Sequence, residues 1–213
     1  MTRTVAVVVA ALWLLGSSAQ SIAAPLALHN TGEGLVQGDP DPNWMVELPD
    51  GTVLGPAISA TDPNDAWISP TPPNTWIGIA GRDFAPIGTY KYSTTFVIGA
   101  GFDPSTASLS GFWWSDDPDS ANGIYLNGVN VSTFDGAGWF VLNSANAAFD
   151  VTSGFVGGVN LLTFYVTNTG GPGGTLVQGL AGTVDPVPEP STMLLLGTGL
   201  LGLVGLNRRR RKE

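Results

Sequence analysis

Two adjacent tryptophans beside a group of aspartates are the residues of this sequence best suited to binding a ligand. Trp113 and Trp114 closely precede Asp116, Asp117 and Asp119. Because neighbouring side chains on a β-strand point to opposite faces, one of the two indoles can lie outside the core. An exposed indole offers a flat apolar surface to a sugar ring, and carboxylates accept hydrogen bonds from its hydroxyls. The alternative is that one indole packs in the core and the other against the sheet edge.

Two groups of oxygen-bearing side chains are candidate ligands for Ca²⁺, which prefers oxygen. The candidates are Asp116, Asp117 and Asp119 in one expected loop, and Asp39, Asp41 and Asn43 with D-x-D-x-N spacing upstream. Trp44 stands where an EF-hand loop needs glycine, and Pro40 and Pro42 stiffen the turn. Aspartate next to proline, asparagine or glycine also builds turns through hydrogen bonds to its own backbone. A structural Ca²⁺ and simple turn formation are therefore alternative interpretations.

The residue patterns of most enzyme classes are absent from the sequence. There is no cysteine and only one histidine, His29, which excludes thiolate chemistry and makes a Ser-His-Asp triad improbable. No G-x-S-x-G, no H-E-x-x-H and no glycine-rich phosphate loop after a parallel strand occurs. A glycosidase needs two carboxylates about 5 to 10 Å apart, and sequence alone cannot pair them. We expect a protein that is not an enzyme, with a carbohydrate-active hydrolase as the less favoured alternative.

Acidic charge is concentrated in the middle of the chain. The formal net charge is −9, but six of the eight basic residues lie at the extreme ends. Between residues 25 and 185 only Arg82 and Lys91 oppose fifteen acidic residues, so this region carries −13. A domain of that charge repels phosphate backbones. We therefore expect no nucleic-acid partner.

Residues 1–23 have the features of a secretory signal peptide. Arg3 and the amino terminus supply positive charge, residues 5–15 form the apolar run VAVVVAALWLL, and small residues follow. Cleavage after Ala23, or after Ala19, fits the small-x-small rule; an uncleaved anchor is the alternative. Export without cysteine indicates a bacterial envelope or extracellular protein that relies on its core and not on disulfides. Residues 24–185 are then the exported domain.

Three features follow one another in residues 186–213. They are a proline-rich motif, an apolar segment at 193–206 and a basic tail, with the motif in Val187, Pro188, Glu189, Pro190 and Ser191 and the tail in Arg208, Arg209, Arg210, Arg211 and Lys212. Fourteen helical residues reach about 21 Å, which is short of a hydrocarbon core of about 30 Å. We expect a short helix that holds the chain transiently in the inner membrane, with the basic tail in the cytoplasm.

This combination resembles the PEP-CTERM sorting signal. The resemblance implies a Gram-negative bacterium that makes exopolysaccharide, and recognition at Pro188-Glu189-Pro190 by exosortase, a membrane-embedded cysteine protease-like enzyme. It also implies loss of the hydrophobic tail and a final location in the cell envelope or outside the cell. The prolines keep the segment extended, as a protease needs. A plain C-terminal anchor on a proline-rich stalk is the alternative.

The middle of the chain predicts an all-β fold. Short runs rich in β-branched and aromatic residues alternate with Gly, Pro, Asn and Asp, without sustained helical periodicity. Residues 89–98 are the clearest half-buried strand, with aromatic and apolar residues concentrated at every second position. Asn127-Gly128 predicts a hairpin with a type I′ turn over residues 123–131. About ten such strands favour an antiparallel β-sandwich or jelly roll.

The order of these segments also resembles the galactose-binding-like jelly roll. The motifs are GTY at 88–90, LSGFW at 109–113, an acidic loop with Asn122, IYLNG at 124–128 and GVNLLTFYVTN at 158–168. The resemblance implies the fold of a sugar-binding module over residues 30–185, and it transfers no sugar-binding residue.

Three functions follow from these observations. The leading one is a non-enzymatic exported protein that associates with exopolysaccharide in the envelope or biofilm matrix. The second is a structural matrix protein that self-associates through sheet edges or through Ca²⁺ bridges between its acidic domains. The third is a carbohydrate-active hydrolase.

Overall fold

The computed structural model describes residues 22–60, 67–79, 85–132, 134–138, 140 and 144–188, together with Gly197 and Gly199. The chain divides into two units, one formed by Ala23–Asp185 and the other by Met1–Ile22 with Pro186–Glu213. Residues 1–21 of the predicted signal peptide and all of the predicted C-terminal helix except Gly197 and Gly199 lie outside the described residues. Among the residues that are described, no helix has the length and apolar character needed to cross a membrane.

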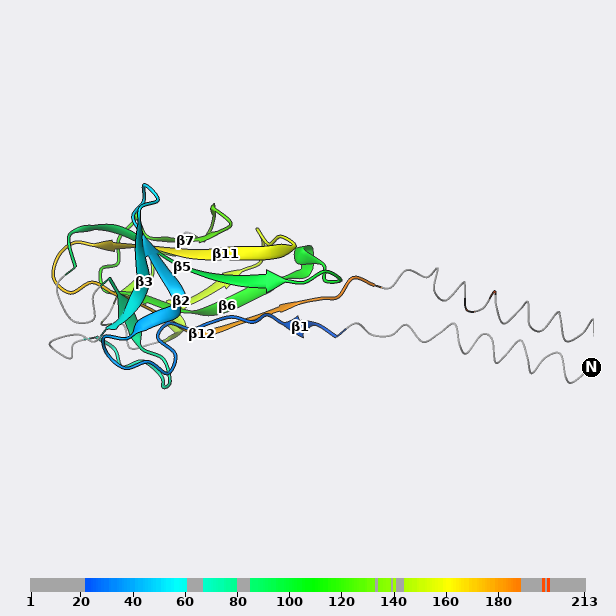
Figure 1. The fold of residues 1–213 in the computed structure, drawn as a ribbon, viewed down its shortest axis with the longest axis horizontal. Helices are drawn as coiled ribbons and strands as arrows, with labels where there is room; N and C mark the ends of the chain where they lie inside the picture. Colours follow the sequence, from blue (N-terminus) through cyan, green and yellow to red (C-terminus); the bar gives the residue numbers. More distant parts are fainter. Residues whose placement is uncertain are drawn as a thin grey trace, which may run out of the picture. The chain divides into compact units, whose positions relative to one another are not determined.

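The central unit, Ala23–Asp185, is all-β, as the sequence predicts (Figure 1). Two short 3₁₀ turns, η1 (Pro104–Thr106) and η2 (Ser144–Ala147), accompany the strands. Within the described residues the strands are β1 (Ala24–Pro25), β2 (Pro40–Glu47), β3 (Val53–Ala60), β4 (Trp76–Gly78), β5 (Gly88–Ile98), β6 (Ser108–Ser115), β7 (Gly123–Leu126), β8 (Val129–Ser132), β9 (Ala137–Gly138), β10 (Ala148–Val151), β11 (Gly158–Asn168) and β12 (Thr175–Val184).

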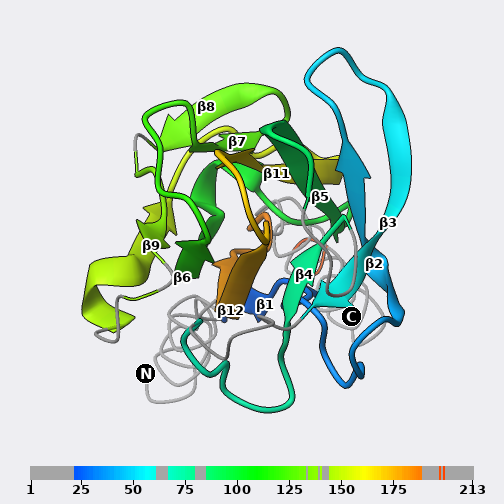
Figure 2. The same cartoon turned by 90° about the vertical axis from the view of Figure 1, so that its left-hand side faces the viewer.

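One sheet contains all of these strands. Its hydrogen-bonded order is β10-β6-β12-β4-β3-β2-β5-β11-β7-β8, and β1 and β9 are added at the side, on β12 and β6. The pairs are antiparallel except for β6 with β9. Figure 2 shows the strands following one another around the core, from β6 through β12, β4, β3, β2, β5 and β11 to β7 and β8.

The sheet curls, so that two groups of its strands, here called its two arms, lie face to face. Trp113 on β6 and Phe149 on β10 both contact Phe164 on β11, with ring centroids 5.0 and 5.6 Å apart. Because β6 and β11 are distant in the hydrogen-bonding order, only a curled sheet allows these contacts. The arm β10-β6-β12 therefore packs across one core against the arm β5-β11-β7. Each large apolar side chain buried there contributes about 1.5–3 kcal/mol of transfer free energy.

The strongest local predictions are confirmed. In β5, the residues Tyr90, Tyr92, Phe96 and Ile98 are buried in the core, and β5 pairs with β11 residue for residue along its whole length. Burial also raises the pKa of the Tyr92 phenol well above its usual range. β7 and β8 form the expected hairpin. Asn127 has φ 52° and Gly128 has φ 81°, and a type I′ turn requires positive φ at both positions.

Candidate functional site

Both tryptophans of the predicted sugar platform are buried. Trp113 is 0% exposed and Trp114 is 1% exposed. They point to opposite faces of β6 as expected, since Trp113 belongs to the main core and Trp114 to a second, smaller cluster. That second cluster lies on the outward face of β6 and also contains Ile68, Trp76, Ala137, Ala147 and Leu176. Side chains from the segment before β4, from β9 and from η2 thus cover the outward indole, and neither ring offers an open face to a sugar.

A single buried threonine links the two indole-bearing residues to β12. The Trp113 indole N–H donates to Thr175 Oγ1 at 2.8 Å, and that hydroxyl donates in turn to the Trp114 carbonyl at 2.9 Å. Thr175 is the first residue of β12. The Trp113–Trp114 pair therefore anchors strand pairing, which is a structural role.

The aspartates after β6 hold the loop together through separate hydrogen bonds. They accept from three different N–H groups: Asp116 from the Trp67 indole at 2.6 Å, Asp117 from the Thr169 backbone at 2.7 Å, and Asp119 from the Ala121 backbone at 2.8 Å. The described residues contain no group of three His, Cys, Asp or Glu side chains that could hold a metal ion. In this structure the hydrogen bonds of these three aspartates, Asp116, Asp117 and Asp119, stabilise the loop after β6.

The upstream group, Asp39, Asp41 and Asn43, lies at the start of a strand. β2 begins at Pro40, so most of this group lies in a strand. Asp41 is buried and accepts hydrogen bonds from the backbone N–H groups of Gly32 at 2.7 Å and of Asn43 at 2.9 Å. Its carboxylate thereby joins the N-terminal segment to β2.

Asn122 is predicted from the sequence only as part of a loop motif, but its side chain forms hydrogen bonds to several segments of the domain. Its buried amide N–H groups donate to Ser115 Oγ and to the carbonyls of Asp117 and Asp135, at 3.0–3.2 Å. Its Oδ1 accepts from the Thr167 backbone at 2.7 Å. This one side chain thus joins the end of β6 and the loop after it to Asp135, 13 positions away, and to Thr167, 45 positions away. Asparagine at the start of an expected strand, directly after an acidic loop, is the only local signal for this role.

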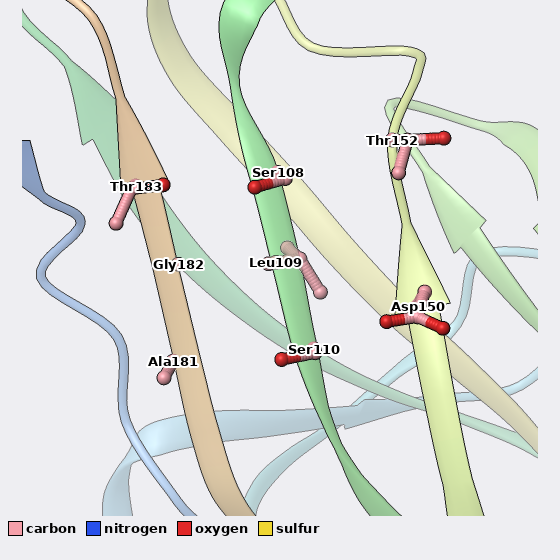
Figure 3. A pocket seen from close by; sticks show the side chains of 8 residues that line it. All are labelled: Ser108, Leu109, Ser110, Asp150, Thr152, Ala181, Gly182 and Thr183. Atoms are coloured by element: carbon pink, nitrogen blue, oxygen red, sulfur yellow. The ribbon is translucent and has the colours of Figure 1, made fainter. Parts of the chain in front are cut away.

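The outer face of β10, β6 and β12 carries a hollow of about 220 Å³ (Figure 3). It is lined by Ser108, Leu109, Ser110, Asp150, Thr152, Ala181, Gly182 and Thr183. Across the strands, Ser110 lies opposite Asp150 on one side and Ala181 on the other, and Ser108 lies opposite Thr183. Figure 3 shows the hydroxyls of Ser108 and Thr183 pointing toward each other across the space between β6 and β12.

Small side chains explain the hollow. Leu109 points inward to the main core, so only its backbone contributes to the floor. Gly182 lies opposite Leu109, and a Cβ there would lie 2.6 Å from the Ser108 carbonyl oxygen. The outward residues carry hydroxyls and one carboxylate, which donate and accept hydrogen bonds. The alternation of residues 106–115 already predicts Ser108 and Ser110 on one face of a strand, but it does not show which neighbouring side chains leave space there.

The C-terminal end of the domain is fixed at Asp185. Its backbone N–H donates to Thr106 Oγ1 at 2.9 Å, and its carbonyl accepts from the Asp103 backbone at 2.8 Å. Asp103 also caps η1 through its side chain. Hydrogen bonds from Ser105 hold the pKa of the Asp103 carboxyl below its usual value.

The chain after Asp185 carries the sorting signal. Val187 and Pro188 are exposed, whereas Glu189, Pro190, Ser191 and the basic tail lie outside the described residues. Residues 186–211 match the PEP-CTERM protein-sorting motif. The motif identifies an exported protein that is targeted to exosortase and reaches the cell envelope through the membrane. Comparison with curated proteins and with solved structures found no match.

Proposed function

We propose that this chain is a non-enzymatic envelope or extracellular-matrix protein of a Gram-negative bacterium, and that its processed domain associates with exopolysaccharide. The observation that carries the proposal is the position of the sorting motif. The motif begins at residue 186, directly after the hydrogen-bonded Asp185. Removal of the tail within the motif leaves the β-domain whole, as delivery of a folded module requires.

The architecture supports a sugar-binding type of fold. Antiparallel strands in two arms that face each other across one core are the arrangement of a β-sandwich, and within that class we propose a galactose-binding-like jelly roll. A hydrolase is less well supported, since glycoside hydrolysis uses two carboxylates and, of the residues that the structure describes, Asp150 alone brings a carboxylate to the hollow.

Self-association is the second candidate function, and one surface favours it. Val97 on β5 and Val159 on β11 lie directly opposite each other and are 59% and 65% exposed. Leu161, also exposed, lies two residues along β11. Apolar side chains that cluster on the surface of a soluble domain mark interaction sites when the patch is large.

Two measurements on material from the producing bacterium test the proposal. Intact mass of the purified protein is compared between the wild type and a strain that lacks exosortase. The expected result is loss of the basic tail in the wild type alone. The processed protein is then sedimented with the organism's own exopolysaccharide, where we expect it in the pellet. A protein that keeps its tail in both strains, or stays in the supernatant at every polysaccharide concentration, would overturn the proposal.

A further inference from the structure

We propose that the hollow on the outer face of β10, β6 and β12 binds a short stretch of a neutral polysaccharide chain lying along β6. This inference rests on the proposed association with exopolysaccharide, and it adds the site and the class of glycan. Three features support it: the size of the hollow, its chemistry and an aromatic ring on the same face of β6.

The size of the hollow fits part of a chain and not a whole small molecule. Its volume of about 220 Å³ is below the roughly 300–1,000 Å³ of pockets that enclose a drug-sized ligand. Its width is set by three neighbouring strands, about 10 Å from β10 to β12. The outward residues of β6 are about 7 Å apart. An elongated ligand along β6 therefore meets successive rows of polar side chains.

The chemistry of the lining favours a neutral sugar. Ser108, Ser110, Thr152 and Thr183 carry hydroxyls, which both donate and accept hydrogen bonds, and Asp150 accepts them. Sugar hydroxyls have the same dual capacity. Among the residues that the structure describes, no lysine, arginine or histidine lines the hollow, and residues 25–185 carry a formal charge of −13. An anionic polysaccharide would meet repulsion there and no countercharge.

An aromatic ring lies further along the same face of β6, beyond the residues that line the hollow. Phe112 is the next outward residue of β6 after Ser110, and it is only partly buried. Its neighbours across the strands are Ala148 on β10 and Gln178 on β12. Gly179, at the bulge of β12, lies beneath the ring, whose nearest atom is 3.1 Å from the position of a Cβ at that glycine. Phe112 thus supplies an apolar surface on which the non-polar face of a sugar can pack.

The test is affinity electrophoresis of the processed protein in native gels that contain a polysaccharide. The polysaccharides are a neutral β-glucan, a neutral mannan, a neutral galactan, the anionic alginate and the organism's own exopolysaccharide. Ser110→Arg fills the hollow, and Asp150→Asn keeps its shape but removes the charged acceptor. Both residues are exposed, so both variants are expected to fold. Thr95→Arg, at an exposed position on the outer face of β5, is the control for an added charge.

We expect retardation of the wild type by at least one neutral polysaccharide and none by alginate. Ser110→Arg is expected to abolish it, Asp150→Asn to weaken affinity about tenfold, and Thr95→Arg to leave it unchanged. Equal retardation of Ser110→Arg and wild type would overturn the site, while binding to the organism's exopolysaccharide would leave the proposed function standing. Retardation by alginate alone would overturn the neutral class. The absence of binding to every polysaccharide, including the organism's own, would overturn the proposed function itself.

Discussion

The two arms of the sheet share one core but differ on their outer faces. Around Tyr165 on β11 the outward side chains of β5, β11 and β7 cover one another: the Lys91 ammonium lies 5.8 Å from the centre of the Tyr165 ring, which lies 4.4 Å from the Tyr125 ring. Ser93 and Thr163 on this face are buried and joined by a hydrogen bond of 2.9 Å. On β10, β6 and β12 the outward residues are short, and a hollow remains. Side-chain size, and not strand geometry, thus decides where a ligand can lie.

Two glycines, one facing outward on β7 and one facing inward on β12, show how the two faces are built. Next to Gly123 on β7, the Tyr125 ring approaches to 3.3 Å of the Cβ position and fills the space that the missing side chain leaves. Next to Gly182 on β12, the nearest atoms belong to the backbone of β6 and to apolar side chains. The first glycine is covered by an aromatic ring, whereas the second allows strands to approach closely beneath an open surface.

The largest effect is expected from the core that both arms share. Trp113→Ala removes an indole that contacts Phe164 and bonds Thr175, so both faces lose their support. We expect a loss of about 3–5 kcal/mol in the free energy of unfolding, measured by urea titration. Trp114→Ala is the comparison, because it removes an indole from the second cluster, on the outward face of β6, and leaves the main core intact. If Trp113→Ala and Trp114→Ala lost the same amount of stability and the same amount of polysaccharide binding, the separation between the main core and the second cluster would be contradicted.

A smaller effect is expected from Gly182→Ala. The new Cβ would meet a backbone oxygen 2.6 Å away, so β12 and β6 must shift apart, at a cost of about 1–3 kcal/mol. Gly123→Ala meets the flexible side chains of Asn130 and Tyr125 at 3.3 Å and should cost less. Thermal unfolding of the two variants measures the difference. A greater loss of thermal stability in Gly123→Ala than in Gly182→Ala would contradict the view that the face formed by β6 depends on the close approach of the β6 and β12 backbones.

Opening the covered face should affect stability without affecting polysaccharide binding. Tyr165→Ala removes the ring between Lys91 and Tyr125, and we expect a loss of about 1–2 kcal/mol from the aromatic and cation–π contacts. Affinity electrophoresis should show unchanged retardation. Loss of retardation in this folded variant would place the glycan on the β5 face.

The smallest effect concerns Asp103, which lies on neither face. Its folded-state pKa is lowered by hydrogen bonds from Ser105, so its contribution to stability is present above the unfolded pKa of about 3.9. That contribution is lost as the pH falls through the lower folded-state value. Asp103→Asn should therefore narrow the difference in stability between pH 5 and pH 2, measured by urea titration at each pH. An unchanged difference would contradict the assignment.

The sequence predicted what depends on local pattern. Alternation along residues 89–98, the Asn127-Gly128 turn and the sorting motif are all properties of short segments. For Trp114 the sequence left an exposed sugar platform and packing against the sheet edge as alternatives, because alternation gives the direction of a side chain and not what covers it. The structure shows the packed alternative. Asp116 bonds to Trp67, which is 49 positions away. The hollow likewise depends on the pairing of β6 with β12, whose register shifts between Gln178 and Ala181.

The pairing of β1 with β12 has a consequence for delivery. Ala24 lies opposite Val184, and Leu26 donates a backbone hydrogen bond to Gly182 at 2.9 Å, so the chain enters and leaves the domain at adjacent positions. If the predicted signal peptide is cleaved after Ala23 and the tail is removed within the sorting motif, both cuts fall next to the same strand pair. Neither cut removes a residue of that pair.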